Sequence, residues 1–161
     1  MSADGNGGFF SRFGKRQLVL TSPVVGTSIR IEDVPDQVFS AKMLGEGAAY
    51  VFEGDTVYAP CDGKVIVVAS TKHAIGFAVK DVEILLHVGL DTVNLKGQGF
   101  TALVSEGDRV RRGQPILKLD RELLSALDAD LTTMMVITSQ AGECVVHEPG
   151  AVTLESPSIS F

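Results

Sequence analysis

Short apolar runs, separated by Gly, Pro and Asp, constrain the fold of this chain most strongly. From Leu18 onward the runs are rich in Val, Ile and Leu, and each is too short for a typical helix. Turn signals such as Asp62-Gly63 and Glu106-Gly107-Asp108 lie between them. Regular spacing of this kind is typical of sandwiches and barrels. The sequence therefore predicts an all-β fold, an antiparallel β-sandwich or barrel.

The predicted strands extend through most of the chain. They are QLVLTS, TSIRI, AAYVFEG, DTVYAP, GKVIVVAS, IGFAVK, VEILLHVGL, ALVSEG, PILKLD, MMVITS, ECVVHE and AVTLES. With 161 residues, 45% of them hydrophobic, the chain can bury one core without disulfide or metal crosslinks. We therefore expect residues 1–17 to be a flexible tail and residues 18–161 to be a single domain.

Two segments have helical character instead. The first is DRELLSALDAD, where Asp120 or a neighbour can cap a short surface helix. Its leucines recur at helical spacing: Leu123, Leu124 and Leu127. The second is residues 34–42, where Pro35 suits the first helical position and Val38 and Phe39 can face inward. We expect one or two short helices on the surface of the β-fold.

Several classes of protein are disfavoured by composition. Cys61 and Cys144 have neither a CxxC spacing nor the companions of a zinc finger, so we expect no disulfide scaffold and no structural zinc. No secretory signal or long apolar span is visible, which predicts a cytoplasmic protein. A net charge of −6 argues against nucleic-acid binding and suits a basic protein partner. Phe9, Phe10 and Phe13 offer the alternative of membrane contact by the tail.

Histidine is scarce, with only three in the chain, and His87 has the most informative surroundings. It lies near the end of VEILLHVGL, and strand alternation places Leu85, His87 and Gly89 on one side. A glycine beside an imidazole leaves room for other groups to approach. We expect His87 to lie in a recess and His147 to be a surface histidine.

His73 is predicted to lie close to His87. Lys80 is seven positions from each histidine, and a turn at Lys80 and Asp81 would fold the segment between them into a hairpin. One imidazole could then act as a nucleophile and the other could stabilise phosphoryl charge, with the Thr71 hydroxyl orienting a ring. Each histidine could equally satisfy a buried backbone carbonyl, so spacing alone leaves both interpretations open.

One stretch resembles a known family. HVGLDTVNLKGQGF, residues 87–100, is similar to the active-site segment of the glucose-class enzyme IIA proteins of the bacterial phosphoenolpyruvate-dependent sugar phosphotransferase system. Further similar segments follow the same order along residues 18 to about 145: SPVVGTSIRIEDVPDQVFSAKMLGEGAAY, TVYAPCDGKV, TKHAIG, SEGDRVRRGQPILKLD and LTTMMVITS. The segment between the two histidines is one residue shorter than is common in that family.

The resemblance implies a monomeric phosphocarrier with a β-fold of the duplicated hybrid-motif type. His87 would accept a phosphoryl group from the phosphohistidine of the carrier protein HPr and pass it to the IIB component of a glucose or N-acetylglucosamine transporter. His73 would support the transfer and Thr71 would orient a histidine. No cofactor is implied, and the membrane would be contacted only through the partner.

The resemblance also implies a rim where the partner proteins dock. Asp36 and Asp91 match acidic positions that can meet the basic surface of HPr. Four further residues match an apolar collar, although core packing explains them equally well: Val38, Phe39, Leu44 and Leu85.

Three rival functions remain to be compared with this interpretation. Covalent biotin and lipoyl carriers have a similar pattern of turns, but the chain lacks their exposed lysine turn. Zinc peptidases of the lysostaphin type need an HxH pair, which is absent here, and zinc held by His73 and His87 would be incidental. A structural or regulatory binding module predicts that replacing His87 leaves partner binding untouched.

Overall fold

The computed structural model describes residues 17–139 and 142–161, so the predicted tail, with Phe9, Phe10 and Phe13, lies outside the described residues except for Gln17. The strands are β1 (Val19–Thr21), β2 (Gly26–Arg30), β3 (Gly47–Phe52), β4 (Thr56–Tyr58), β5 (Gly63–Val68), β6 (Ala74–Val79), β7 (Val82–Leu90), β8 (Phe100–Ala102), β9 (Arg109–Val110), β10 (Pro115–Leu119), β11 (Asp130–Ser139), β12 (Val145–Val146), β13 (Gly150–Val152) and β14 (Pro157–Ser160). The helices are η1 (Ile31–Asp33), α2 (Gln37–Ser40), η2 (Thr92–Leu95) and α3 (Arg121–Ala126). None of the helices in the described ranges is long and apolar enough to cross a membrane.

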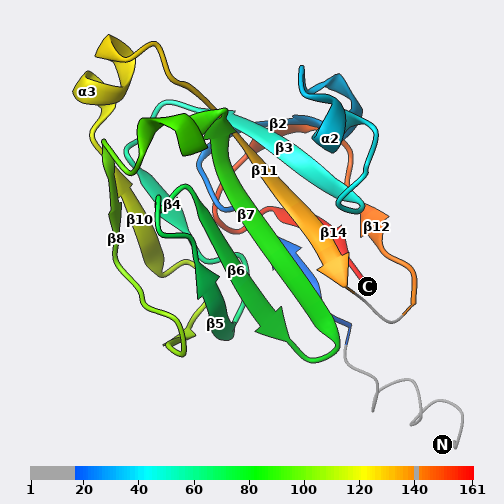
Figure 1. The fold of residues 1–161 in the computed structure, drawn as a ribbon. Coiled ribbons are helices and arrows are strands. Elements are labelled where there is room, and N and C mark those ends of the chain that lie inside the picture. The colour runs from blue at the N-terminus through cyan, green and yellow to red at the C-terminus, as the bar shows by residue number, and fades with distance from the viewer. Residues whose placement is uncertain (1–16, 140–141) are drawn as a thin grey trace, which may run out of the picture.

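In the described part of the chain, the strands form one eight-stranded sheet and two three-stranded sheets, and every pairing is antiparallel. The order in the large sheet is β13-β2-β3-β11-β7-β6-β5-β9, and the small sheets are β1-β14-β12 and β4-β10-β8. In Figure 1, α2 and α3 lie at one end of the molecule, away from the β6–β7 turn. The prediction of an antiparallel all-β sandwich is confirmed.

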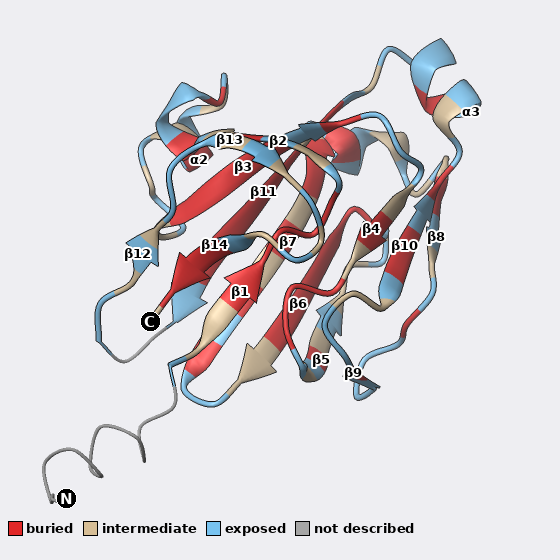
Figure 2. Cartoon of the chain, turned by 180° about the vertical axis from the view of Figure 1, so that it is seen from behind, coloured by how far each residue is buried: buried red, intermediate tan, exposed pale blue. Residues whose placement is uncertain are grey.

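Strand β7 shows how the sequence pattern positions its side chains. Its buried residues alternate with more exposed ones along the strand, and the buried set is Val82, Ile84, Leu86 and Val88. Because alternate residues of a strand face opposite sides, this set lies in the main core and His87 faces away from it. Figure 2 shows the buried residues running along the central strands. The alternation predicted for His87 is confirmed.

The hairpin predicted at Lys80 and Asp81 is present. Val79 of β6 pairs with Val82 of β7, so a two-residue turn joins the strands. Lys80 in this turn adopts the left-handed conformation, with a φ of 53°. The pairing continues without a break to Ala74 opposite His87. The short segment between the two histidines is therefore accommodated by a tight turn in an otherwise regular hairpin.

Both predicted helices are present, but the predictions for Val38 and Pro35 in the helix within residues 34–42 were wrong. Asp120 caps α3 by accepting a hydrogen bond from the Leu123 N–H. In α2, Phe39 is buried as predicted, but Val38 is 41% exposed and does not face inward. Pro35 lies before the capping residue Asp36 rather than in the first turn, because α2 begins only at Gln37.

Some strands differ from the sequence prediction. The segment ALVSEG is largely a turn, because the strand there is β8 and ends at Ala102 opposite Leu117. Strand β14 was not predicted, since Ile159 stands between two serines and Pro157 begins the strand, which gives no apolar run. It nevertheless pairs with both β1 and β12, and Ile159 from it is fully buried. Pairing with other strands can therefore make a segment a strand even where its own composition does not predict one.

Candidate functional site

His87 lies on the face of the large sheet opposite the main core. In the antiparallel register, Met134 pairs with Ala49 and with His87, and His87 pairs with Ala74, so these four residues form one row across β3, β11, β7 and β6. The two alanines are small, and Ala74 leaves space beside the imidazole. The residue opposite His87 on β6 is therefore small, and the recess that the sequence suggested from Gly89 stays a prediction.

The imidazole of His87 is held through one nitrogen. Its Nδ1 lies 3.0 Å from the carbonyl oxygen of Gly89. A carbonyl can only accept, so Nδ1 carries the hydrogen in this contact. No hydrogen bond from the described residues reaches Nε2, which leaves its lone pair available as a nucleophile.

His73 is brought against His87 by the hairpin. Their ring centroids are 4.7 Å apart and the rings meet edge to face at 80°. His73 is 8% exposed and precedes β6, and its backbone carbonyl accepts a hydrogen bond from the Val88 N–H at 2.7 Å. The expectation that the two histidines lie close together is confirmed.

Thr71 contacts the second histidine. Its Oγ1 lies 2.6 Å from Nδ1 of His73. Residues 70–73 form a tight turn before β6, closed by the hydrogen bond from the Ala69 N–H to the Ala74 carbonyl, so Thr71 reaches the ring through the turn and not through strand alternation. This contact occupies one ring nitrogen of His73, and no hydrogen bond from the described residues reaches the other.

An aromatic ring closes the other side of His87. The Phe39 ring lies 5.0 Å from the imidazole centroid, tilted by 58°. Phe39 belongs to a second, small apolar cluster with Ile31, Val34, Ala49, Met134 and Val136. Figure 1 shows α2 beside the strands that carry this cluster. The imidazole of His87 is therefore bordered by apolar groups that limit access of water.

The environment shifts the pKa of both histidines downward. Burial lowers the pKa of His73. Burial also lowers the pKa of His87, and the neighbouring His73 lowers it further, while the Gly89 carbonyl and the charges of Asp36 and Asp91 oppose the change. Because the ordinary value is about 6.5, both rings are mainly neutral at pH 7.

The two aspartates predicted for the acidic rim act electrostatically on His87, and they share a pocket with two further aspartates that the sequence did not suggest. Asp36 and Asp91 line a pocket of about 380 Å³ with Asp128 and Asp130. Asp130 reaches it because β11 pairs with β7 there, opposite Leu90. The sequence signal was the pair of aspartates that ends DRELLSALDAD, which was read only as the end of a helix.

The apolar residues predicted for the rim occupy different environments. Val38 and Leu44 are 41% and 40% exposed and flank the buried Phe39 along the chain, whereas Leu85 is half-buried on the same face of β7 as His87. The nearby Met43 is also exposed, at 69%. Exposed apolar side chains beside a reactive group are typical of a docking surface, and this role remains a prediction.

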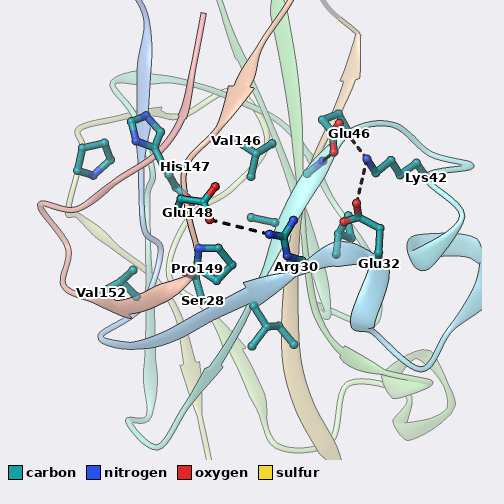
Figure 3. A pocket seen from close by; sticks show the side chains of 16 residues that line it. Ser28, Arg30, Glu32, Lys42, Glu46, Val146, His147, Glu148, Pro149 and Val152 are labelled. Carbon is teal, nitrogen blue, oxygen red and sulfur yellow. Dashed lines mark hydrogen bonds and ion pairs between the residues drawn. The ribbon is translucent and has the colours of Figure 1, made fainter.

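A second recess has a volume of about 200 Å³, and like the first pocket it is lined by neither His73 nor His87. Figure 3 shows that Lys42 lies between Glu32 and Glu46, at 3.3 and 3.1 Å, and that Arg30 faces Glu148. The cations that line it are thus already paired with carboxylates. His147, which also lines it, is exposed as predicted, with Nε2 2.8 Å from the Ser160 hydroxyl. We do not assign the phosphoryl site to this recess.

The described residues contain no group of three or more His, Cys, Asp or Glu side chains that could hold a metal ion.

Comparisons with known proteins connect this geometry to a family. Residues 18–142 match the family model described as "phosphoenolpyruvate-dependent sugar phosphotransferase system, EIIA 1". The chain is 45% identical over 122 residues to the glucoside-specific EIICBA component of this transport system from Staphylococcus carnosus (strain TM300). That match covers 75% of this chain but only 18% of the relative, so the chain spans about a fifth of the length of that protein.

A solved structure is similar over nearly the whole of both chains. Glucose permease IIA from Mycoplasma capricolum superposes with a TM-score of 0.84 at 31% sequence identity. The superposition covers 92% of this chain and 97% of that one.

Proposed function

Because the chain belongs to the EIIA 1 family of the phosphoenolpyruvate-dependent sugar phosphotransferase system, we propose that residues 18–161 act as one phosphocarrier domain with His87 as the phosphorylated residue. The observation that carries the proposal is the pair of imidazoles, one buried and one half-buried, whose centroids are 4.7 Å apart. The free Nε2 of a neutral His87 is the nucleophile that phosphoryl transfer requires.

The transfer step follows from the hydrogen bond at Nδ1. The Nε2 lone pair of His87 attacks the phosphorus of a donor phosphohistidine, the new N–P bond forms, and the electron pair of the breaking N–P bond returns to the donor nitrogen. Nδ1 keeps its proton, so positive charge develops on the ring, and the Gly89 carbonyl stabilises that charge. Delivery to the acceptor is the reverse step.

His73 and Phe39 assist this step in different ways. His73 faces the reactive ring, and a hydrogen on its free nitrogen can donate to the phosphoryl oxygens as their charge develops, while Thr71 holds the other nitrogen. Phe39 shields one side of His87, and a docked partner would exclude the remaining water and so limit hydrolysis of the phosphoryl group. No metal is needed in this mechanism.

The chemistry of the rim supports protein partners on both sides of the transfer. The four carboxylates of Asp36, Asp91, Asp128 and Asp130 favour a donor with a basic surface, for which HPr is the candidate. The acceptor would be a IIB component, and the names of the two similar proteins favour a glucose or glucoside transporter. N-acetylglucosamine remains an alternative, because sugar selection belongs to other components of the system.

The test is phosphorylation by phosphoenolpyruvate, enzyme I and HPr. We expect an acid-labile phosphate on the native chain, none on His87→Ala, and a labelled but transfer-deficient His73→Gln. A native chain that stays unlabelled, under conditions that label an established enzyme IIA, would contradict the proposal. Labelling of His87→Ala would mean that a residue other than His87 is phosphorylated.

A further inference from the structure

The loop that follows His87 is shaped by one buried threonine. Thr92, the first residue of η2, is 1% exposed, and its hydroxyl donates a hydrogen bond to the Val88 carbonyl at 2.6 Å. Between them, Gly89 and Asp91 both have positive φ, at 92° and 57°. The threonine hydroxyl therefore closes a tight loop directly after the reactive residue.

The methyl group of Thr92 confines Gly89. A Cβ atom added to Gly89 would lie 2.3 Å from Thr92 Cγ2 and 2.9 Å from the Asp130 carbonyl oxygen. The Gly89 backbone is thus enclosed between the Thr92 side chain on one side and the start of β11 on the other. Little space remains in which the Gly89 peptide could rotate.

Val88 links this threonine to both histidines. Its N–H donates to the His73 carbonyl at 2.7 Å, and its own carbonyl accepts from Thr92. The next carbonyl along the chain, that of Gly89, is the acceptor for Nδ1 of His87. A change at Thr92 would therefore affect the position of the Gly89 carbonyl, the acceptor that determines which ring nitrogen of His87 carries the proton.

We propose that Thr92 is a positioning residue for His87: its hydroxyl and methyl hold the Val88–Gly89 backbone so that the Gly89 carbonyl keeps the proton on Nδ1 and leaves Nε2 to take the phosphoryl group. The inference rests on the proposed function, but it concerns a residue that never touches the phosphoryl group. A threonine that only fills the core would affect stability and leave the proton of His87 where it is.

The test compares Thr92→Val, which keeps the shape and removes the hydroxyl, with Thr92→Ser, which keeps the hydroxyl. Two-bond ¹H–¹⁵N NMR spectra of the unphosphorylated proteins report which ring nitrogen of His87 carries hydrogen. We expect Thr92→Val to populate both tautomers and to be phosphorylated about 10- to 100-fold more slowly, since small displacements at a reacting centre cost this much. Thr92→Ser should restore the native tautomer and most of the rate.

A matched control separates this effect from simple loss of a buried hydroxyl. Thr21 is also buried and its hydroxyl donates to the Pro60 carbonyl, on an element distant in sequence from the histidines, so Thr21→Val should change neither tautomer nor rate. If Thr92→Val does not give a cooperative thermal transition, Thr92→Ala is measured in its place.

The outcomes are distinct. A native tautomer and native rate in Thr92→Val, or in Thr92→Ala, would overturn the positioning role. If the native chain cannot be phosphorylated at all, the proposed function fails, but the NMR spectra still decide whether Thr92 fixes the tautomer.

Discussion

Each histidine of the pair has one ring nitrogen tied to a different partner. His87 Nδ1 faces a backbone carbonyl, which can only accept, whereas His73 Nδ1 faces a hydroxyl, which can donate or accept. The first contact fixes the proton of His87, and in the proposed transfer the second would let His73 adjust to a phosphoryl group as its charge changes. Two residues of the same type can therefore perform different tasks because their neighbours differ.

The lowered pKa values predict a pH dependence at this scale. Each ring has a lower pKa in the folded state than its unfolded value of about 6.5, so near that pH the unfolded state binds more protons than the folded state. The free energy of unfolding should therefore fall as pH falls from 7.5 through 6.5. Urea denaturation of the native chain, His73→Gln and His87→Gln at several pH values measures this slope.

We expect each variant to have a shallower slope than the native chain. Differences measured at pH 8, where both rings are neutral, report only lost packing and serve as the internal control. Equal slopes in all three proteins would mean that burial does not disfavour the charged rings.

At the scale of elements, the residue that caps helix α2 affects both the stability of the fold and the pKa of His87. The Asp36 carboxylate accepts a hydrogen bond from the Val38 N–H at 2.9 Å and so caps the helix that carries Phe39. The charge of the same carboxylate raises the pKa of His87. One side chain thus has a structural role through its oxygen and an electrostatic role through its charge.

These two roles can be separated by two substitutions. Asp36→Asn keeps the capping oxygen and should leave the free energy of unfolding nearly unchanged, whereas Asp36→Ala should lower it by about 1 kcal/mol. Both should lower the pKa of His87 further, because both remove the charge. Chemical denaturation and NMR titration of His87 measure the two effects, and equal destabilisation by both variants would show that the cap contributes nothing.

Elements that alternate strongly could be predicted from the sequence, and elements defined by their partners could not. The β6–β7 hairpin followed from Lys80-Asp81 and the apolar alternation on either side of it. Strand β14 did not, because Ser158, Ile159 and Ser160 are buried in a strand that depends on pairing with β12 and with β1, and β1 lies at the other end of the described chain. Val38 was assigned to the interior because a four-residue helix has too few turns to define its buried face.

In the candidate site, too, some contacts could be predicted from the sequence and others could not. The proximity of His73 to His87 follows from counting along one hairpin, whereas Asp128 and Asp130 reach the rim through pairing of β11 with β7. The contact of Thr71 with His73 was expected, but it forms through a turn that strand alternation does not describe. Local contacts are thus accessible to sequence reasoning, and contacts across the sheet require the register.

At the scale of the whole molecule, the C-terminal strand ties the sheets together. Tyr50 of β3 in the large sheet is fully buried, and its hydroxyl is hydrogen-bonded to the Ser158 hydroxyl of β14 in the small sheet. Burial also raises the pKa of Tyr50, so its hydroxyl stays protonated and able to donate. Within the small sheet, Phe161 extends the pairing of β14 with β1 by donating its N–H to the Leu18 carbonyl.

The connection predicts a coupled pair of substitutions. Tyr50→Phe should lower the free energy of unfolding by about 1–3 kcal/mol, because the buried Ser158 hydroxyl loses its partner, and Ser158→Ala should have a similar effect. The double variant should cost less than the sum, since neither hydroxyl is then left unpaired. Chemical denaturation of the four proteins measures the coupling, and strictly additive losses would contradict it.

The hairpin origin of the two histidines has a consequence for how proteins of this kind can diverge. The proposed reactive groups come from one continuous stretch, residues 71–92, whereas the surrounding rim, apart from Leu85 and Asp91, is drawn from residues 36–44 and 128–130. Changes in these two rim segments can alter which protein docks while the sequence of the hairpin that would hold the phosphoryl group stays the same. Selection for a new partner and selection for the chemistry would therefore act largely on separate parts of the gene.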